Sequence, residues 1–116
     1  MIRFLARVIH YNKLSESGGV YYYRLKVFHV NLEEELILAL LFSSKGVVST
    51  RQLYNAFYHS KLEDHTIREE IRSSLDSLEL KIRDTLGTEN SIYTKAPDVK
   101  DRRSHIYYFN KDHFAV

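Results

Sequence analysis

The sequence predicts a single α+β domain, with β-strands near both termini and helices between them. Three observations predict this fold class. The chain has 116 residues, of which 44% are hydrophobic, and this suits one domain, 1–116, with one buried core. Residues alternate between two faces near the N-terminus and β-formers cluster near the C-terminus, as in strands, whereas apolar residues recur at helical spacing in the middle. Four glycines and one proline leave little room for linkers.

An N-terminal β-hairpin is predicted over residues 1–30. The stretch "IRFLARVIHY" (2–11) alternates between two faces, which indicates a strand with one wetter face. The turn-forming stretch "NKLSESGG" (12–19) is expected to be a loop. The stretch "VYYYRLKVFHV" (20–30) is rich in β-branched and aromatic residues and indicates a second strand, antiparallel to the first.

A three-helix core is predicted over residues 31–87. The first helix begins at Asn31, because Glu34 stands three positions further on, as in a capping box. Its wide apolar band predicts that it is largely buried, and a glycine ends it. After a short extended link, Ser49 and Gln52 offer a second capping box for the second helix.

The third helix has the strongest pattern. Thr66 and Glu69 offer another capping box at its start, and Gly87 closes it. Apolar residues recur along it at steps of four, four, three, four and four: Ile67, Ile71, Leu75, Leu78, Ile82 and Leu86. This stripe indicates an amphipathic helix of about 20 residues that packs on the core.

The last predicted element is a β-hairpin over residues 91–110. Two strands, "SIYTK" (91–95) and "SHIYYF" (104–109), are expected to be joined by the polar loop "APDVKDRR" (96–103). The full order of strand, strand, three helices, strand and strand is the layout of a winged helix-turn-helix, in which the C-terminal hairpin is the wing. In that design the third helix can enter a DNA major groove while the hairpin reaches the adjacent backbone or minor groove.

The residue patterns give no support to enzymatic chemistry. The glycines form neither a G-x-G-x-x-G nor a P-loop pattern, and no two histidines flank a Glu at i, i+4. Adjacent carboxylates such as Glu69 and Glu70 are expected on an exposed helix face rather than in a cleft. His59, Asp64 and His65 could meet around a metal, although a polar turn is the simpler interpretation. We therefore expect a non-enzyme without cofactor or metal.

The location of the protein follows from what the sequence lacks. No run of about 18 apolar residues is present, so no membrane span is expected. Arg3 and Arg7 interrupt the apolar N-terminus, which argues against a signal peptide. The absence of cysteine excludes disulfides and thiolate-bound metals. A cytoplasmic location is therefore expected.

The first candidates for DNA contact lie on the third helix, at Arg68, Arg72, Ser73 and Ser77. Arginine can bind guanine through two hydrogen bonds, and serine is a short donor and acceptor. From His65 to Leu86 the helix has four basic and five acidic residues, so contact is expected mainly from its N-terminal half. A solvated face of mixed charge is the alternative.

The second candidates lie in the hairpin, at Lys95, Lys100, Arg102 and Arg103. A positive hairpin tip suits a narrow minor groove, and Asp101 can pair with a neighbouring arginine and orient it. An ordinary polar turn is the alternative. A weaker candidate is the first hairpin, where interleaved basic and aromatic residues could stack single-stranded bases or face another subunit: Arg3, Arg7, Tyr22, Arg24 and Lys26.

Three stretches, "NLEEELILALLFSSKGVVSTRQL", "IRSSLDSLELKI" and "SIYTK", follow one another along the chain. Over residues 30–94 they resemble the DNA-binding effector domain of OmpR/PhoB-type response regulators, in its first helices, recognition helix and entry to the wing. The arginine-rich recognition face of that family is replaced by Asp76, Ser77 and Glu79, so base-reading roles do not carry over there. Its Gly-x-Gly-Tyr wing turn is also absent. The stretch "DVKDRRSHIYYFN" instead resembles the wing of MarR-type or SarA-type regulators, whose DRR tip meets the minor groove.

The resemblance implies a winged-helix transcription regulator that is dimeric. Together with the layout and the candidate residues, it predicts a small stand-alone regulator that binds double-stranded DNA as a homodimer. The alternative is a winged-helix protein-interaction module without intrinsic sequence-specific DNA binding. In that case the acidic third helix and the tyrosine-rich hairpin would bind another regulator.

Overall fold

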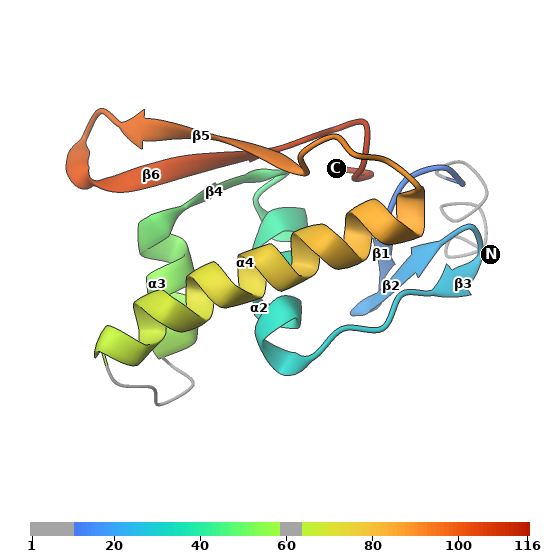
Figure 1. The fold of residues 1–116 in the computed structure, drawn as a ribbon, viewed down its shortest axis with the longest axis horizontal. Coiled ribbons are helices and arrows are strands. Elements are labelled where there is room, and N and C mark those ends of the chain that lie inside the picture. The colour runs from blue at the N-terminus through green and yellow to red at the C-terminus, as the bar shows by residue number, and fades with distance from the viewer. Residues whose placement is uncertain (1–10, 59–63) are drawn as a thin grey trace.

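The computed structural model describes residues 11–58 and 64–116 (Figure 1). Within these residues the chain forms three helices and two small antiparallel sheets, which confirms the α+β class. The longest helix crosses the molecule diagonally, and the C-terminal hairpin projects over the end that holds the second helix of the core (Figure 1). The elements occur in this order: β1 (Ser15–Ser17), β2 (Val20–Tyr23), β3 (Lys26–Val27), α2 (Leu32–Ser43), β4 (Val47–Ser49), α3 (Thr50–Tyr58), α4 (Asp64–Leu86), β5 (Tyr93–Asp98) and β6 (Asp101–Phe109).

The N-terminal sheet differs from the predicted hairpin, because the expected single strand over 20–30 folds back on itself. Arg24 and Leu25 have φ angles of 51° and 67° and form a two-residue turn between β2 and β3. The reversal lets Tyr21 and Phe28 both reach the core, where the Phe28 N–H donates to the Tyr21 carbonyl at 2.7 Å. Part of the predicted loop over 12–19 is instead strand β1.

The first predicted strand (2–11) lies outside the described residues except for Tyr11, which is in a turn. Its candidate residues Arg3 and Arg7 lie outside them as well. The sheet that is described has the order β1-β2-β3.

Helix α2 begins as predicted. Asn31 is its N-cap, and the Glu34 N–H donates to Asn31 Oδ1 at 2.8 Å. In return the Asn31 N–H donates to Glu34 Oε1 at 2.9 Å, which completes the capping box. The helix ends at Ser43, and Gly46, with φ of 87°, lets the chain turn into β4.

The second capping box is also present, because the Ser49 N–H donates to Gln52 Oε1 at 2.8 Å and the Gln52 N–H to Ser49 Oγ at 3.1 Å. The third is wrong, since α4 begins at Asp64 and Thr66 lies inside the helix. The predicted apolar stripe of α4 is confirmed: five members are buried in the core and Leu86 is packed against it. Helices α2 and α3 cover this stripe.

The C-terminal sheet has the order β4-β6-β5, so the short link after α2 pairs with the hairpin. The predicted long loop over 96–103 is wrong, because only Val99 and Lys100 lie between the strands. The turn is this tight because Asp98 Oδ1 accepts the Lys100 N–H at 2.9 Å. Pro97 is tolerated because β5 is an edge strand.

The C-terminal tail joins the two sheets, a feature that the sequence did not indicate. The Leu14 N–H donates to the His113 carbonyl at 2.8 Å, and the Ala115 N–H donates to the Leu14 carbonyl at 2.9 Å. Phe114 lies between these two hydrogen-bonding residues and is buried. The centroid of its ring is 6.3 Å from that of Phe42 and 5.7 Å from that of Phe109. The tail is therefore part of the core.

Candidate nucleic-acid interface

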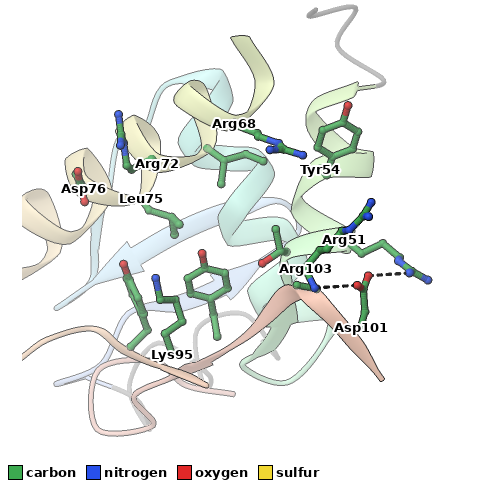
Figure 2. A pocket seen from close by; sticks show the side chains of 14 residues that line it. Arg51, Tyr54, Arg68, Arg72, Leu75, Asp76, Lys95, Asp101 and Arg103 are labelled. Atoms are coloured by element: carbon green, nitrogen blue, oxygen red, sulfur yellow. Dashed lines mark hydrogen bonds and ion pairs between the residues drawn. The ribbon is translucent and has the colours of Figure 1, made fainter. Parts of the chain in front are cut away.

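A groove of about 590 Å³ lies between α3, α4 and the β5–β6 hairpin (Figure 2). Its floor is apolar, with Ile71 and Leu75 from α4 and Tyr107 from β6, all largely buried. Basic side chains from all three elements line it: Arg51, Arg68, Arg72, Lys95 and Arg103. We call this site the cationic groove.

Two contacts at the start of α3 fix the hairpin beside the helices. Thr50 Oγ1 accepts the His105 N–H at 3.0 Å and donates to the His105 carbonyl at 3.2 Å. The next residue, Arg51, forms an ion pair with Asp101 at 3.0 Å. The width of the groove is therefore set by bonds between α3 and β6 rather than by the hairpin alone.

Asp101 is held ionised by these neighbours. Its Oδ1 accepts the Arg103 N–H at 3.0 Å and its Oδ2 accepts from Arg51. The hydrogen bond from the Arg103 backbone, followed by that from Arg51, keeps the pKa of Asp101 below its usual value. The predicted pairing of Asp101 with an arginine is thus present, but the partner comes from α3.

Arg103, and not Arg102, is the arginine of β6 that lines the groove. Arg103 stands four positions before Tyr107, so the alternation of a strand puts these two side chains on one face and Arg102 on the other. Pro97 pairs with His105 and Asp98 pairs with Asp101, so residues 102–104 form a bulge without a partner on β5.

The charge of the groove is positive. Five basic side chains line it against two carboxylates, Asp76 and Asp101, and Asp101 is already paired with Arg51. Within residues 11–58 and 64–116, no ion pair involves the other four basic residues that line the groove. Unpaired cations gathered on a concave surface concentrate a positive potential and attract anions.

The groove also presents phenolic hydroxyls. Burial raises the pKa of Tyr107 and of Tyr93, and the carboxylate of Glu79 adds to the shift at Tyr93. Both hydroxyls therefore remain protonated near neutral pH and can donate hydrogen bonds. The two rings meet edge to face with centroids 5.2 Å apart.

Half of the predicted contact residues converge on the groove: Arg68, Arg72, Lys95 and Arg103. In Figure 2 Arg68 extends toward Tyr54 and Lys95 extends from the hairpin toward α4, while Arg72 points outward. Ser73, Lys100 and Arg102 are exposed but do not line the groove. Ser77 is occupied elsewhere, because its hydroxyl donates to Glu34 Oε2 at 2.9 Å.

Glu34 is the buried centre of a network between α2 and α4. Its side chain is 0% exposed and accepts from Lys81 Nζ at 2.6 Å as well as from Ser77 and Asn31. Burial opposes ionisation, but these hydrogen bonds outweigh it and hold the pKa of Glu34 below its usual value. Ser77 therefore has a structural role here.

Sequence reasoning missed Arg51 and Tyr54. Both line the groove from α3, three positions apart and therefore on one face of the helix. Leu53 and Phe57 mark the buried side of this helix, and Tyr54 lies at the edge of that side, three positions before Phe57, so its place at the groove depends on how α3 packs.

The weaker candidate on the first hairpin is described only in part. The Arg24 guanidinium lies 5.7 Å from the Tyr11 ring and 5.3 Å from the Tyr23 ring. For the proposed metal set, His59 lies outside the described residues, and no group of three metal-binding side chains gathers within them.

Comparison with known proteins adds no assignment: no family model, curated protein or solved structure matches this chain. Among the described residues no helix combines the length and apolar character needed to cross a bilayer.

Proposed function

We propose that this protein is a winged-helix transcription regulator that binds double-stranded DNA through the cationic groove. The observation that carries the proposal is that five basic side chains from three separate elements line one groove, although Arg72 points outward from it. Such a cluster suits a phosphate backbone, whose contacts supply much of the affinity of DNA-binding proteins.

The topology supports the winged-helix assignment. β4 lies between α2 and α3 in sequence and pairs with β6, so the hairpin is anchored beside the core helices. The hairpin extends past the end of the molecule that holds α3 and the start of α4 (Figure 1). Winged-helix proteins use this arrangement to contact a major groove and the flanking backbone.

In this proposal α4 enters the major groove through its N-terminal half. Arg68 and Arg72 lie in that half, and Ser73 is exposed beside them. Arginine there can reach either phosphates or a guanine edge. That half also carries Glu69 and Glu70, so the two arginines, rather than the half helix as a whole, would contact the DNA.

The hairpin would contact the flanking backbone or the minor groove. Lys100 lies in the tight turn at its tip, next to Val99, which is 98% exposed. Arg102 is exposed on the bulge outside the groove, where it can reach a second phosphate.

A homodimer would double the few base pairs that a single module can read. The edge strand β3 and the exposed Val20 and Val27, at 37% and 46%, are candidates for the contact between subunits. Sedimentation equilibrium at micromolar concentration tests this directly. A strictly monomeric protein, alone and with DNA, would remove the dimer from the proposal.

A protein-interaction module is the second candidate, and one observation favours it. Glu69, Asp76 and the 68% exposed Leu80 share the outer side of α4, which therefore combines negative charge with an apolar group. Such a helix face suits a basic groove on another protein better than it suits phosphates.

An electrophoretic mobility shift with random genomic fragments distinguishes the two candidates. The DNA-binding proposal predicts a shift at low salt and micromolar protein, since phosphate contacts alone give measurable non-specific affinity. No shift under these conditions would reject it and favour the protein-interaction module.

A further inference from the structure

The cationic groove combines an apolar floor with a basic rim. We infer that it holds a single nucleotide, with the base on the apolar floor and the phosphate on the basic rim. The inference rests on the groove assigned to DNA in the proposed function and extends it to a ligand of defined size. A volume of about 590 Å³ lies within the range of small-molecule sites, roughly 300–1,000 Å³.

The floor and one wall suit an aromatic base. Ile71, Leu75 and Tyr107 form an apolar surface, and Tyr54 adds a ring from α3. That ring is itself supported, because Tyr58 stacks on it with centroids 6.4 Å apart and an interplanar angle of 15°. Bases stack on such platforms without sequence preference.

The rim suits a phosphate. Arg68 and Arg103 come from opposite sides of the groove, and Lys95 extends into it from the hairpin (Figure 2). Planar guanidinium groups bind phosphate oxygens through two parallel hydrogen bonds. The protonated hydroxyl of Tyr93, which also lines the groove, offers a neutral donor beside these cations.

Ser104 also lines the groove from the bulge and is 5% exposed. Its Oγ makes no hydrogen bond within the described part of the chain, but the atom is buried away from solvent, so the inference rests on the floor and the rim of the groove rather than on this hydroxyl.

The nucleotide has two sources, a free nucleotide or an unpaired nucleotide of a nucleic-acid strand. Titration calorimetry with four small probes tests the site itself: adenosine 5′-monophosphate, ribose 5-phosphate, adenosine and inorganic phosphate. We expect adenosine 5′-monophosphate to bind, and ribose 5-phosphate to bind about 5- to 150-fold more weakly, the ratio that corresponds to the loss of one stacked base. Equal affinity for these two probes would overturn the inference, as would no binding of the nucleotide at about 10 mM, a concentration that detects even weak sites.

Three variants, each checked for folding, test whether the nucleotide binds in this groove. Arg68→Gln and Tyr54→Leu should each weaken binding of adenosine 5′-monophosphate about tenfold, in line with a charge-assisted bond or a stacked ring. Lys111→Gln, at an exposed residue after β6 with no part in the groove, should leave it unchanged. Circular dichroism confirms that each variant is folded. If all three variants bind alike, the nucleotide is not in this groove.

Two further titrations separate the sources and the two proposals. A single-stranded oligonucleotide that binds much more tightly than the mononucleotide identifies an unpaired nucleotide as the source, and equal affinity per site identifies a free one. If the protein shifts a DNA duplex in the mobility assay but does not bind adenosine 5′-monophosphate, this inference is wrong and the DNA-binding proposal stands. If the protein binds adenosine 5′-monophosphate but shifts no duplex, the inference stands and the DNA-binding proposal is wrong.

Discussion

Replacing Lys81 by Met tests how much the buried ion pair between α2 and α4 stabilises the fold. The variant keeps the methylene stem of the side chain but removes the ammonium group that lies 2.6 Å from Glu34 Oε1. Glu34 is completely buried, so its carboxylate would lose its only charged partner among the described residues. A buried charge without its partner is one of the few single changes that destabilise strongly.

The magnitude follows from the burial of the two groups. Removing one partner of a buried ion pair costs about 3–5 kcal/mol. The Lys81 side chain is 37% exposed, so water already screens the pair, and Ser77 and Asn31 still donate to the carboxylate. We therefore expect the lower end, about 3 kcal/mol, which lowers the melting temperature by about 10 °C for a domain of this size.

The pH dependence gives the prediction its sharpest form. Because the folded pKa of Glu34 is lowered, its ionised form stabilises the protein above the unfolded value, and this contribution is lost as the pH falls through the folded pKa. Removing Lys81 raises the pKa of Glu34, so the carboxyl group of the variant protonates at a higher pH than that of the wild type. Once the carboxyl group is neutral, the loss of the ammonium group costs less stability. The stability gap between wild type and variant should therefore shrink as the pH falls from about 7 to about 4, where an unperturbed glutamate side chain titrates.

Urea denaturation followed by circular dichroism, repeated across this pH range, measures the gap. Lys111→Met, an exposed residue after β6, is the matched control and should change stability by less than about 0.5 kcal/mol. A loss below about 1 kcal/mol at pH 7 would refute the argument, since it would match a surface ion pair. A gap that stays constant with pH would show that Glu34 is not the titrating group.

Three further predictions concern the cap, the tail and the groove. Asn31→Ala should cost about 1 kcal/mol in urea denaturation, because the capping box of α2 is lost, and an unchanged midpoint would contradict it. Phe114→Ala should cost about 3–5 kcal/mol by the same assay, as expected for a buried phenyl ring, and a loss below about 1 kcal/mol would show that the tail is not part of the core. Asp101→Asn keeps the acceptor for the Arg103 N–H but releases Arg51, and it should tighten duplex binding about threefold by fluorescence anisotropy at low salt. Unchanged or weaker binding by this last variant would place Arg51 outside the interface.

Local signals in the sequence predicted the helical core well. The capping boxes at Asn31 and Ser49 depend on residues three apart, and the stripe of α4 depends on a regular period, so both are readable without the fold. Thr66 is not a cap, because α4 begins two residues earlier, at Asp64, and the Thr66–Glu69 pair therefore lies within the helix. Glu34 was predicted as a capping residue, but its burial against Lys81 arises only when α2 packs on α4.

The sheets were harder to predict, because their turns depend on partners distant in sequence. The turn at Arg24 and Leu25 contains no glycine, so a run of β-formers concealed it. The long hairpin and its bulge at 102–104 arise from pairing with β4 and β5. The sequence shows the basic cluster of the hairpin, but the face on which each arginine lies follows only once residues 101–103 are known to belong to β6 rather than to a loop.

The salt dependence of duplex binding tests the central proposal most directly. Fluorescence anisotropy over a range of salt concentrations gives the slope of log affinity against log salt, which is about −0.9 for each neutralised phosphate. We compare the wild type with Arg68→Gln/Arg103→Gln, which removes one groove cation from α4 and one from the hairpin, and use Lys111→Gln as the control. The proposal predicts weaker binding and a slope smaller in magnitude by about 2 for the double variant only. Binding with the wild-type affinity and slope would contradict it.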